Sequence, residues 1–171
     1  MDTTEFEAAY HGLLRLAESI PDTASYSVPA RDDIDWTLSH IALSDPLLTD
    51  AARGIRNGHP AVVDNQDAMD QGAIAGLIAS TTYQQRVALV RDHAQELREA
   101  LSAIPDQVAD IPVLLRLFNR AGEPLPEQHM PWRDLIALRA TIHIPGHTAR
   151  IKTYASAEDD RTRNADGPRD A

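Results

Sequence analysis

Two histidines near the end of the chain, His143 and His147, have the spacing that a helical metal site requires. Residues four apart lie on one face of a helix, so both imidazoles can bind the same ion. Apolar residues share that face, which predicts that the pair points into the protein core. On an earlier predicted helix, His40 lies on the same face as Trp36 and two leucines. Three inward histidines from two helices predict a metal site with three nitrogen ligands.

A second interpretation is that each of these histidines is a core or boundary residue satisfied by one hydrogen bond. Burying three imidazoles together is unfavourable unless each is paired, and one divalent ion pairs all three. Among the other histidines, the pattern places His11 and His93 at the surface or boundary of helices. His59 and His129 lie in proline-flanked loops, where either could supply a fourth ligand.

The composition excludes several kinds of site. The 171-residue chain has 26 acidic and 16 basic residues, a formal charge of -10, and no cysteine. Without cysteine it can form no disulfide, thiolate zinc cluster, iron-sulfur centre or cysteine nucleophile, so any metal must be bound by His, Asp or Glu. The negative charge repels phosphate backbones, so we expect no nucleic-acid partner. The acidic N-terminus, and the lack of an apolar run of about 18 residues, predict a cytoplasmic protein without membrane contact.

The spacing of apolar residues predicts an all-α fold, a four-helix bundle around one core. A capping box of Thr4 and Glu7 is expected to begin the first helix, and Asp35 to cap the second. A kink is expected near Pro46. A surface connection is expected over residues 22–33. The four predicted helices span about residues 4–20, 34–55, 67–104 and 132–157.

The longest predicted connection, residues 105–131, contains five prolines and one short apolar run. It predicts a long crossover before the last helix, with a small hairpin at residues 119–122. No other strand is expected, because period-two alternation is missing elsewhere. Residues 158–171 contain no large apolar side chain, so we expect a disordered acidic tail after a single domain of residues 1–157.

Two segments resemble the DinB-like family, the damage-inducible metal-binding four-helix-bundle proteins. IDWTLSHIALSD (34–45), with Trp36 four residues before His40, is similar to the second helix of that family. WRDLIALRATIHIPGHTARI (132–151) is similar to its last helix, where a His-x-x-x-His pair follows an initial aromatic residue. The resemblance covers these two helices closely and the whole chain in length and helix order.

This resemblance implies an up-up-down-down bundle that holds a metal through His40, His143 and His147. One departure from the family pattern is the Ile-Pro-Gly sequence between the paired histidines. Pro145 removes a backbone donor and clashes with the carbonyl of Thr141, which predicts a kink or a break between the two ligands. A kink would preserve the site.

The leading functional hypothesis is a metal-dependent enzyme, because relatives in that family include thiol S-transferases and isomerases. It would activate a low-molecular-weight thiol, such as mycothiol, or water for reaction with a small electrophilic metabolite. Zinc is the expected metal, with nickel and iron as alternatives, and three neutral imidazoles leave its full charge available to a substrate. Tyr154 and Arg150 are the expected catalytic side chains, and Trp36 and Arg139 are expected to contact the substrate.

Two other functional interpretations stay open at this point. One is an isomerase, cyclase or hydrolase that uses the metal as a Lewis acid without a thiol. The other is a non-catalytic binding or stress protein of the same family. The expected partner is a small-molecule substrate, and a homodimer is compatible with the sequence.

Overall fold

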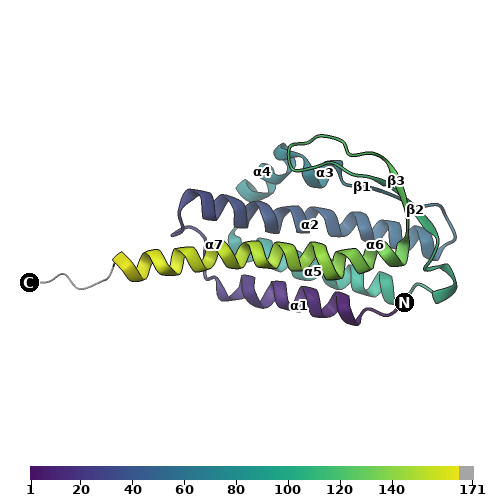
Figure 1. The fold of residues 1–171 in the computed structure, drawn as a ribbon, viewed down its shortest axis with the longest axis horizontal. Coiled ribbons are helices and arrows are strands. Elements are labelled where there is room, and N and C mark those ends of the chain that lie inside the picture. Colours follow the sequence, from purple (N-terminus) through teal and green to yellow (C-terminus); the bar gives the residue numbers. More distant parts are fainter. Residues whose placement is uncertain (166–171) are drawn as a thin grey trace, which may run out of the picture.

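The computed structural model describes residues 1–165 and is mostly helical, with a small three-stranded sheet on one side (Figure 1). The predicted all-α class therefore holds at this coarse level. Four long helical segments lie side by side, and α1 and α2 each contact both α5 and α7. These segments are α1 (Thr4–Ser19), α2 (Val28–Arg56), α5 (Tyr83–Ser102) and the continuous run of α6 (Trp132–Leu138), η2 (Arg139–His143) and α7 (Ile144–Ala165).

The directions of these segments follow from contacts at their ends. The amino group of Met1 donates to the carbonyl of Ile104 at 2.8 Å, so α1 begins where α5 ends. The hydroxyl of Tyr83, at the start of α5, donates to the carbonyl of Ala17 near the end of α1. The backbone N–H of Ser27, just before α2, donates to Glu158 late in α7.

Thus α1 and α6–α7 run one way and α2 and α5 run the other, an up-down-down-up order. The predicted up-up-down-down order is wrong. The predicted position of the crossover is also wrong. Residues 57–82 carry the chain back along the molecule through β1 (Val62–Asp64), α3 (Gln66–Met69) and α4 (Gln71–Ser80), so that α5 starts beside the start of α2. Residues 105–131 instead connect the end of α5 to the start of α6, and both lie at the same end of the bundle.

The small sheet has the order β1-β2-β3, with β2 spanning Pro112–Arg116 and β3 spanning Gln128–Pro131. β1 pairs in parallel with β2, and β2 pairs antiparallel with β3. The predicted hairpin is therefore present, with its turn at residues 119–122 and a further bridge between Phe118 and Pro124. β1 was not expected, because three residues are too few to display alternation.

Several predicted helix starts or caps are wrong. α1 starts at Thr4 without the expected capping box, and Thr3 donates instead to the Glu7 carboxylate at 2.6 Å. α2 starts at Val28, because Pro29 occupies its first turn, where proline is favourable. The expected third helix is divided into α3, α4 and α5, and the capping box that begins α5 is formed by Thr82 and Gln85.

The disordered tail was expected to begin at residue 158, but the helix before it extends further. α7 continues to Ala165, and the carboxylate of Glu158 is buried and accepts hydrogen bonds from both the backbone N–H and the hydroxyl of Ser27. Residues 158–165 are therefore helical, and the remainder of the expected tail, 166–171, lies outside the described residues. Within the part of the chain that the structure describes, no helix is both long and apolar enough to cross a membrane.

The core lies between the long helical segments and continues under the sheet. Its largest fully buried side chains include Trp132, Leu38 and Leu97. A smaller apolar cluster of Trp36, Met69 and Ile74 joins α2 to α3 and α4. This second cluster fixes the side of α2 that carries His40.

Candidate metal centre

Three histidines from two helical segments come together as the spacing predicts. The candidate ligand atoms of His40, His143 and His147 all lie within 4.8 Å of one another. The ring centroids of His143 and His147 are 4.5 Å apart, and each lies about 5.5 Å from that of His40. Nitrogen atoms this close together can bind a single divalent ion after small side-chain movements. We call these three residues the histidine cluster.

His40 is oriented by the short helix α3. Its Nδ1 lies 2.9 Å from the carbonyl oxygen of Ala68, so in the neutral ring Nδ1 carries the proton and donates it to that carbonyl. Nε2 is then the nitrogen left with a lone pair for a ligand. A hydrogen bond from the opposite ring nitrogen to a carbonyl is the usual support of a metal-binding histidine. Trp36 adds a stacked contact, with its ring centroid 5.0 Å from that of His40.

The departure at Pro145 is absorbed by a π turn. Residues Arg139–His143 form a π-helical turn in which the N–H of Ile144 donates to the carbonyl of Arg139, five residues earlier. This wider turn lies immediately before Pro145, where proline would otherwise clash with the preceding α-helical turn. Helix α7 then continues in regular form, so the segment is neither broken nor unwound between His143 and His147.

Burial keeps the histidine cluster neutral. Burial, together with the nearby positive charge of Arg139, lowers the pKa of His40 to about 4, of His147 to about 3 and of His143 to about 2. Neutral imidazole is the form that binds a metal. The Nε2 atom of His143 is buried and has no hydrogen-bond partner.

This arrangement fits a divalent ion better than it fits a set of ordinary core histidines. An ordinary buried histidine is satisfied by a hydrogen bond, yet His143 Nε2 lacks one and its neighbours are two more neutral imidazoles. A divalent ion would be a partner for all three rings at once. Zinc, nickel and iron all accept imidazole ligands, so the donor set does not select one of them.

Beside the histidine cluster lies a second buried polar group, which we call the Arg139 network. Arg139 forms an ion pair with Asp45, and its Nε donates to the Tyr10 hydroxyl at 2.8 Å. Tyr10 in turn donates to Asp45 at 2.6 Å, and Arg139 also donates to Ser44 at 3.0 Å. Arg139, expected to contact a substrate, therefore has its guanidinium engaged within the protein.

At the other side of the histidine cluster, two arginines converge on one acidic residue. Arg150 makes a bidentate contact with Asp33, at 2.6 and 2.8 Å, and Arg120 donates to Asp33 at 2.7 Å. The guanidinium carbon of Arg120 lies 4.0 Å from the Trp36 ring centroid. Tyr154 is half-buried and packs against the main core. The hydrogen bond with Asp33, and to a smaller extent the interaction with Tyr154, raises the pKa of Arg150.

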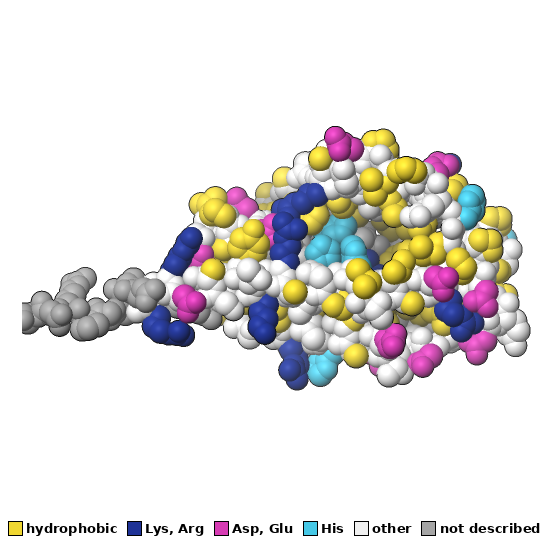
Figure 2. Space-filling view, in the orientation of Figure 1, with side chains coloured by type: hydrophobic (Ala, Val, Ile, Leu, Met, Phe, Trp, Pro, Cys, Tyr) yellow, Lys and Arg dark blue, Asp and Glu magenta, His cyan; other side chains and the backbone are white. Residues whose placement is uncertain are grey.

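An apolar cavity of about 320 Å³ opens onto the histidine cluster. His40 and His143 form part of its wall, and Leu138 and Ile142 reach solvent at its edge, 44% and 65% exposed. Figure 2 shows histidine side chains at the bottom of a hollow, with basic side chains on one side and hydrophobic ones on the other. A small molecule in this hollow would touch the histidine cluster directly.

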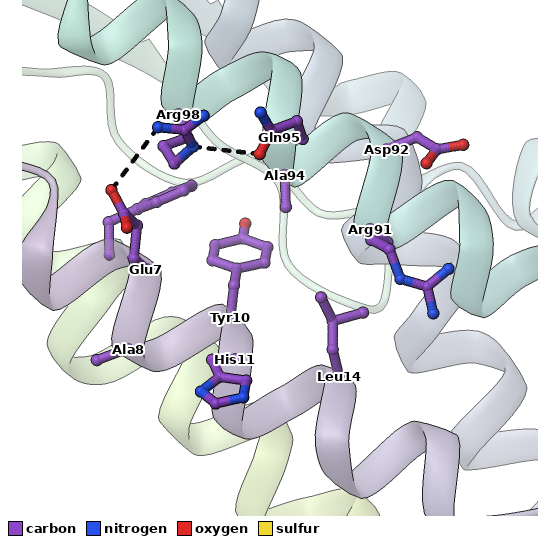
Figure 3. A pocket seen from close by; sticks show the side chains of 11 residues that line it. Glu7, Ala8, Tyr10, His11, Leu14, Arg91, Asp92, Ala94, Gln95 and Arg98 are labelled. Carbon is purple, nitrogen blue, oxygen red and sulfur yellow. Dashed lines mark hydrogen bonds and ion pairs between the residues drawn. The ribbon is translucent and has the colours of Figure 1, made fainter.

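A larger cavity lies elsewhere, between α1 and α5, with a volume of about 570 Å³ (Figure 3). The partly exposed side chain of Arg98 lies at this cavity and contacts Glu7 and Gln95. Its one histidine, His11, is exposed and lies outside the cluster. This groove brings together no group of metal ligands among the described residues, so its volume alone does not make it a candidate metal site.

The other histidines have separate roles. His59 and His129 are exposed and supply no fourth ligand to the cluster. His93 has a structural role: Pro46 lacks the N–H that would bond to the carbonyl of Ala42, and His93 Nδ1 lies 2.8 Å from that carbonyl and donates to it. The helix α2 thus continues through Pro46.

Sequence reasoning missed Asp33 and Arg120. Asp33 was placed in a connection, although it lies seven residues before His40 and so two turns away on the same face of α2. Recognising Pro29 as a helix-starting residue would have revealed it. Arg120 lies at the tip of the hairpin, and no sequence signal connects it to α2.

Comparisons with known proteins add no relative: no protein-family model matches the chain, and neither a curated protein nor a solved structure matches it. What can be inferred about function therefore rests on the histidine cluster, the cavity beside it and the charged groups around it. The DinB-like resemblance of the two helical segments remains a hypothesis at the level of sequence.

Proposed function

We propose that this chain is a DinB-like four-helix bundle that binds one divalent metal ion through His40, His143 and His147 and uses it in an enzymatic reaction of a small molecule. The single observation that carries the proposal is the buried Nε2 of His143, which has no partner and faces two further neutral imidazoles. Bound there, a divalent ion would supply Lewis acidity and lower the pKa of a thiol or water next to it.

Three protein ligands leave room for a substrate. Zinc sites that are purely structural are usually closed by four protein ligands, whereas catalytic sites keep one position open. The described residues supply three histidines to this cluster, and both His143 and His147 are only partly buried. The adjoining cavity gives a small molecule access from solvent.

The protein residues themselves have defined parts in this proposal. Ala68 holds the His40 ring in the tautomer whose Nε2 is free. The Arg139 network holds the π turn, so that His143 points at His40. Leu138 and Ile142, at the edge of the cavity, shield the apolar part of a substrate from water.

A low-molecular-weight thiol is the preferred nucleophile, since the chain has no thiol of its own and the family it resembles includes thiol S-transferases. Water is the alternative, as is Lewis-acid isomerisation without a nucleophile. The apolar lining of the cavity favours a partly apolar electrophilic substrate in each case. A cytoplasmic location would give access to such a thiol.

Metal content and cobalt spectroscopy test this proposal. Protein purified without a His tag should contain about one divalent ion per chain, and His40→Ala or His143→Ala should lose most of it. His59→Ala is the matched control, because His59 is exposed and distant from the cluster, and it should retain the metal. Equal metal in all three variants would place the metal elsewhere.

Cobalt-substituted protein then distinguishes the nucleophiles. A small thiol should add a sulfur-to-cobalt charge-transfer band near neutral pH, because the ion favours the thiolate. Azide serves as a control for access to the open position. A spectrum that responds to azide and not to thiol would support the Lewis-acid alternative, and a response to neither would indicate a closed, non-catalytic site.

A further inference from the structure

Beside the histidine cluster, the two positive charges of Arg120 and Arg150 share a single negative charge, that of Asp33. Among the described residues, Asp33 is the acidic residue that Arg120 and Arg150 contact, and its carboxylate accepts hydrogen bonds from both. One negative charge therefore faces two positive charges. In a chain of net charge -10, this is a local reversal of sign.

Both guanidiniums also retain donors. An arginine offers five N–H groups. The contacts to Asp33 occupy one on Arg120 and two on Arg150, and Tyr154 also interacts with Arg150, so each guanidinium keeps N–H groups that these contacts do not use. The two side chains are 39% and 44% exposed, while that of Asp33 is only 8% exposed. The buried carboxylate thus fixes one edge of each guanidinium and leaves other edges open to a ligand.

The backbone positions of both arginines are well defined. Arg150 lies three residues after His147 on α7, close to one helical turn. Arg120 lies in the hairpin turn, where Gln71 Nε2 donates to its carbonyl at 3.0 Å. The side chain of Asn119 accepts from the N–H groups of Ala121 and Glu123, which closes the same turn. The pair is therefore preorganised for a ligand.

Trp36 connects this charged pair to the histidine cluster. Its ring contacts the Arg120 guanidinium at 4.0 Å and stacks on His40 at 5.0 Å. On the other side of the cluster is the apolar cavity, whose wall includes Leu135 and Ile142. The lining of the hollow thus changes from basic side chains, through the neutral histidines, to apolar side chains (Figure 2).

From this arrangement we propose that Arg120 and Arg150 bind a carboxylate group of the substrate, whose apolar part occupies the cavity on the far side of the histidine cluster. The inference rests on the proposed function in taking the histidine cluster as the place of reaction. It narrows the substrate class to small carboxylic acids with an apolar chain. Planar guanidinium groups suit carboxylates because they donate two parallel hydrogen bonds.

Hexanoate and its uncharged analogue hexanamide are the probes for this site. Binding is followed by tryptophan fluorescence, and Trp36→Phe assigns the signal, because the other tryptophan, Trp132, is fully buried in the core. Wild-type protein should bind hexanoate at least about tenfold more tightly than hexanamide, as expected for charge-assisted hydrogen bonds. Equal affinities would overturn the proposal.

Three substitutions sharpen the test. Arg120→Gln should weaken hexanoate binding about tenfold and leave hexanamide unchanged. Asp33→Asn, which removes the internal anion while keeping its shape, should strengthen hexanoate binding, an outcome that a merely structural role for the arginines does not produce. Arg116→Gln is the matched control, because Arg116 pairs with exposed Glu127, and it should bind like the wild type.

Zinc-loaded protein and protein dialysed free of metal are compared throughout, since a carboxylate can also bind a metal directly. Loss of preference in Arg120→Gln with and without zinc supports the arginine pair. A preference for hexanoate that is present only in zinc-loaded protein and is unchanged in Arg120→Gln would overturn the proposal while leaving the metal site in place. If the wild type contains no metal, the proposed function fails, and the metal-free measurements still decide this inference.

Discussion

The histidine cluster and the Arg139 network lie next to each other, yet they satisfy their polar groups differently. In the Arg139 network, a cation and an anion meet, and Tyr10 and Ser44 add hydrogen bonds. In the histidine cluster, three neutral rings meet without any counter-group, and one buried nitrogen has no partner. The first pairs a positive with a negative charge, although Asp45 Oδ2 has no hydrogen-bond partner, whereas the second contains no charged partner for its three rings.

The difference supports the proposal that the histidine cluster, and not the Arg139 network, binds a ligand. Both groups are attached to the same π turn, because Arg139 begins it and His143 ends it. In the proposed function, the Arg139 network is therefore the anchor of the π turn and the histidine cluster is the site. A substitution should affect stability most at the anchor and ligand binding most at the site.

Breaking the anchor should give the largest effect on stability. Asp45→Ala leaves the Arg139 charge buried without its partner, and such losses typically destabilise a protein by about 3–5 kcal/mol. Urea unfolding of metal-free protein measures this change. Asp50→Ala, which removes an exposed carboxylate from a surface pair with Arg53, should change the unfolding free energy by less than about 1 kcal/mol. Similar losses in the two variants would contradict the assigned anchor.

Stabilisation by bound metal should depend on the histidine cluster. At a free zinc concentration about 100 times the dissociation constant, binding should raise the unfolding free energy of the wild type by about 2.7 kcal/mol. The gain should vanish in His147→Ala and persist in His59→Ala, as measured by urea unfolding with and without zinc. A gain that persists in His147→Ala would remove this residue from the ligand set.

Acid provides a third comparison, in metal-free protein. Burial lowers the pKa of His40 to about 4 and of His147 to about 3, below the ordinary 6.5, so between these values the unfolded chain binds protons that the folded chain does not. Stability is unaffected above pH 6.5 and falls as the pH drops below it, by at most about 1.4 kcal/mol per pH unit for each histidine.

The Arg139 network should respond with the opposite sign. Burial raises the pKa of Asp45, so the folded chain takes up that proton before the unfolded chain does. His147→Ala removes one of the groups whose lowered pKa costs stability in acid. Urea unfolding at several pH values between about 7 and 4.5 should therefore show a shallower loss of stability in this variant than in the wild type. Parallel curves would mean that His147 titrates normally in the folded protein.

The smallest effect is expected far from both groups, at the end of α7. Glu158→Ala removes the acceptor for the N–H and hydroxyl of Ser27, which precedes α2, and should cost about 1 kcal/mol of unfolding free energy. Metal content should stay at the wild-type level. Loss of metal in this variant would show that the histidine cluster depends on the last turns of α7 and not on the Arg139 network alone.

Spacing within a helix carried most of what sequence could predict about the site. The interval of four between His143 and His147, and the inward position of His40, were sufficient to bring the three together. Apolar periodicity likewise predicted the long helices. The hairpin followed from the short apolar run and the turn residues 119–122.

The errors arose where contacts between distant segments determine the outcome. Asp35, expected as a cap, lies inside α2 and forms a buried ion pair with Arg86 at 2.8 Å. Burial of that pair depends on α5, which no local pattern reveals. The order of helix directions was also wrong, because the direction of α5 depends on how far residues 57–82 travel along the molecule.

The π turn has a consequence for the ancestry of this segment. A helix advances about 100° and 1.5 Å per residue, so a five-residue turn is what a regular helix becomes when it gains one residue. Deleting one residue from Arg139–His143 would rotate one side of the helix against the other. The shortened chain could keep Arg139 on Asp45 or His143 beside His40, but not both. An alignment of this helix with a relative that lacks Pro145 should therefore allow a one-residue gap.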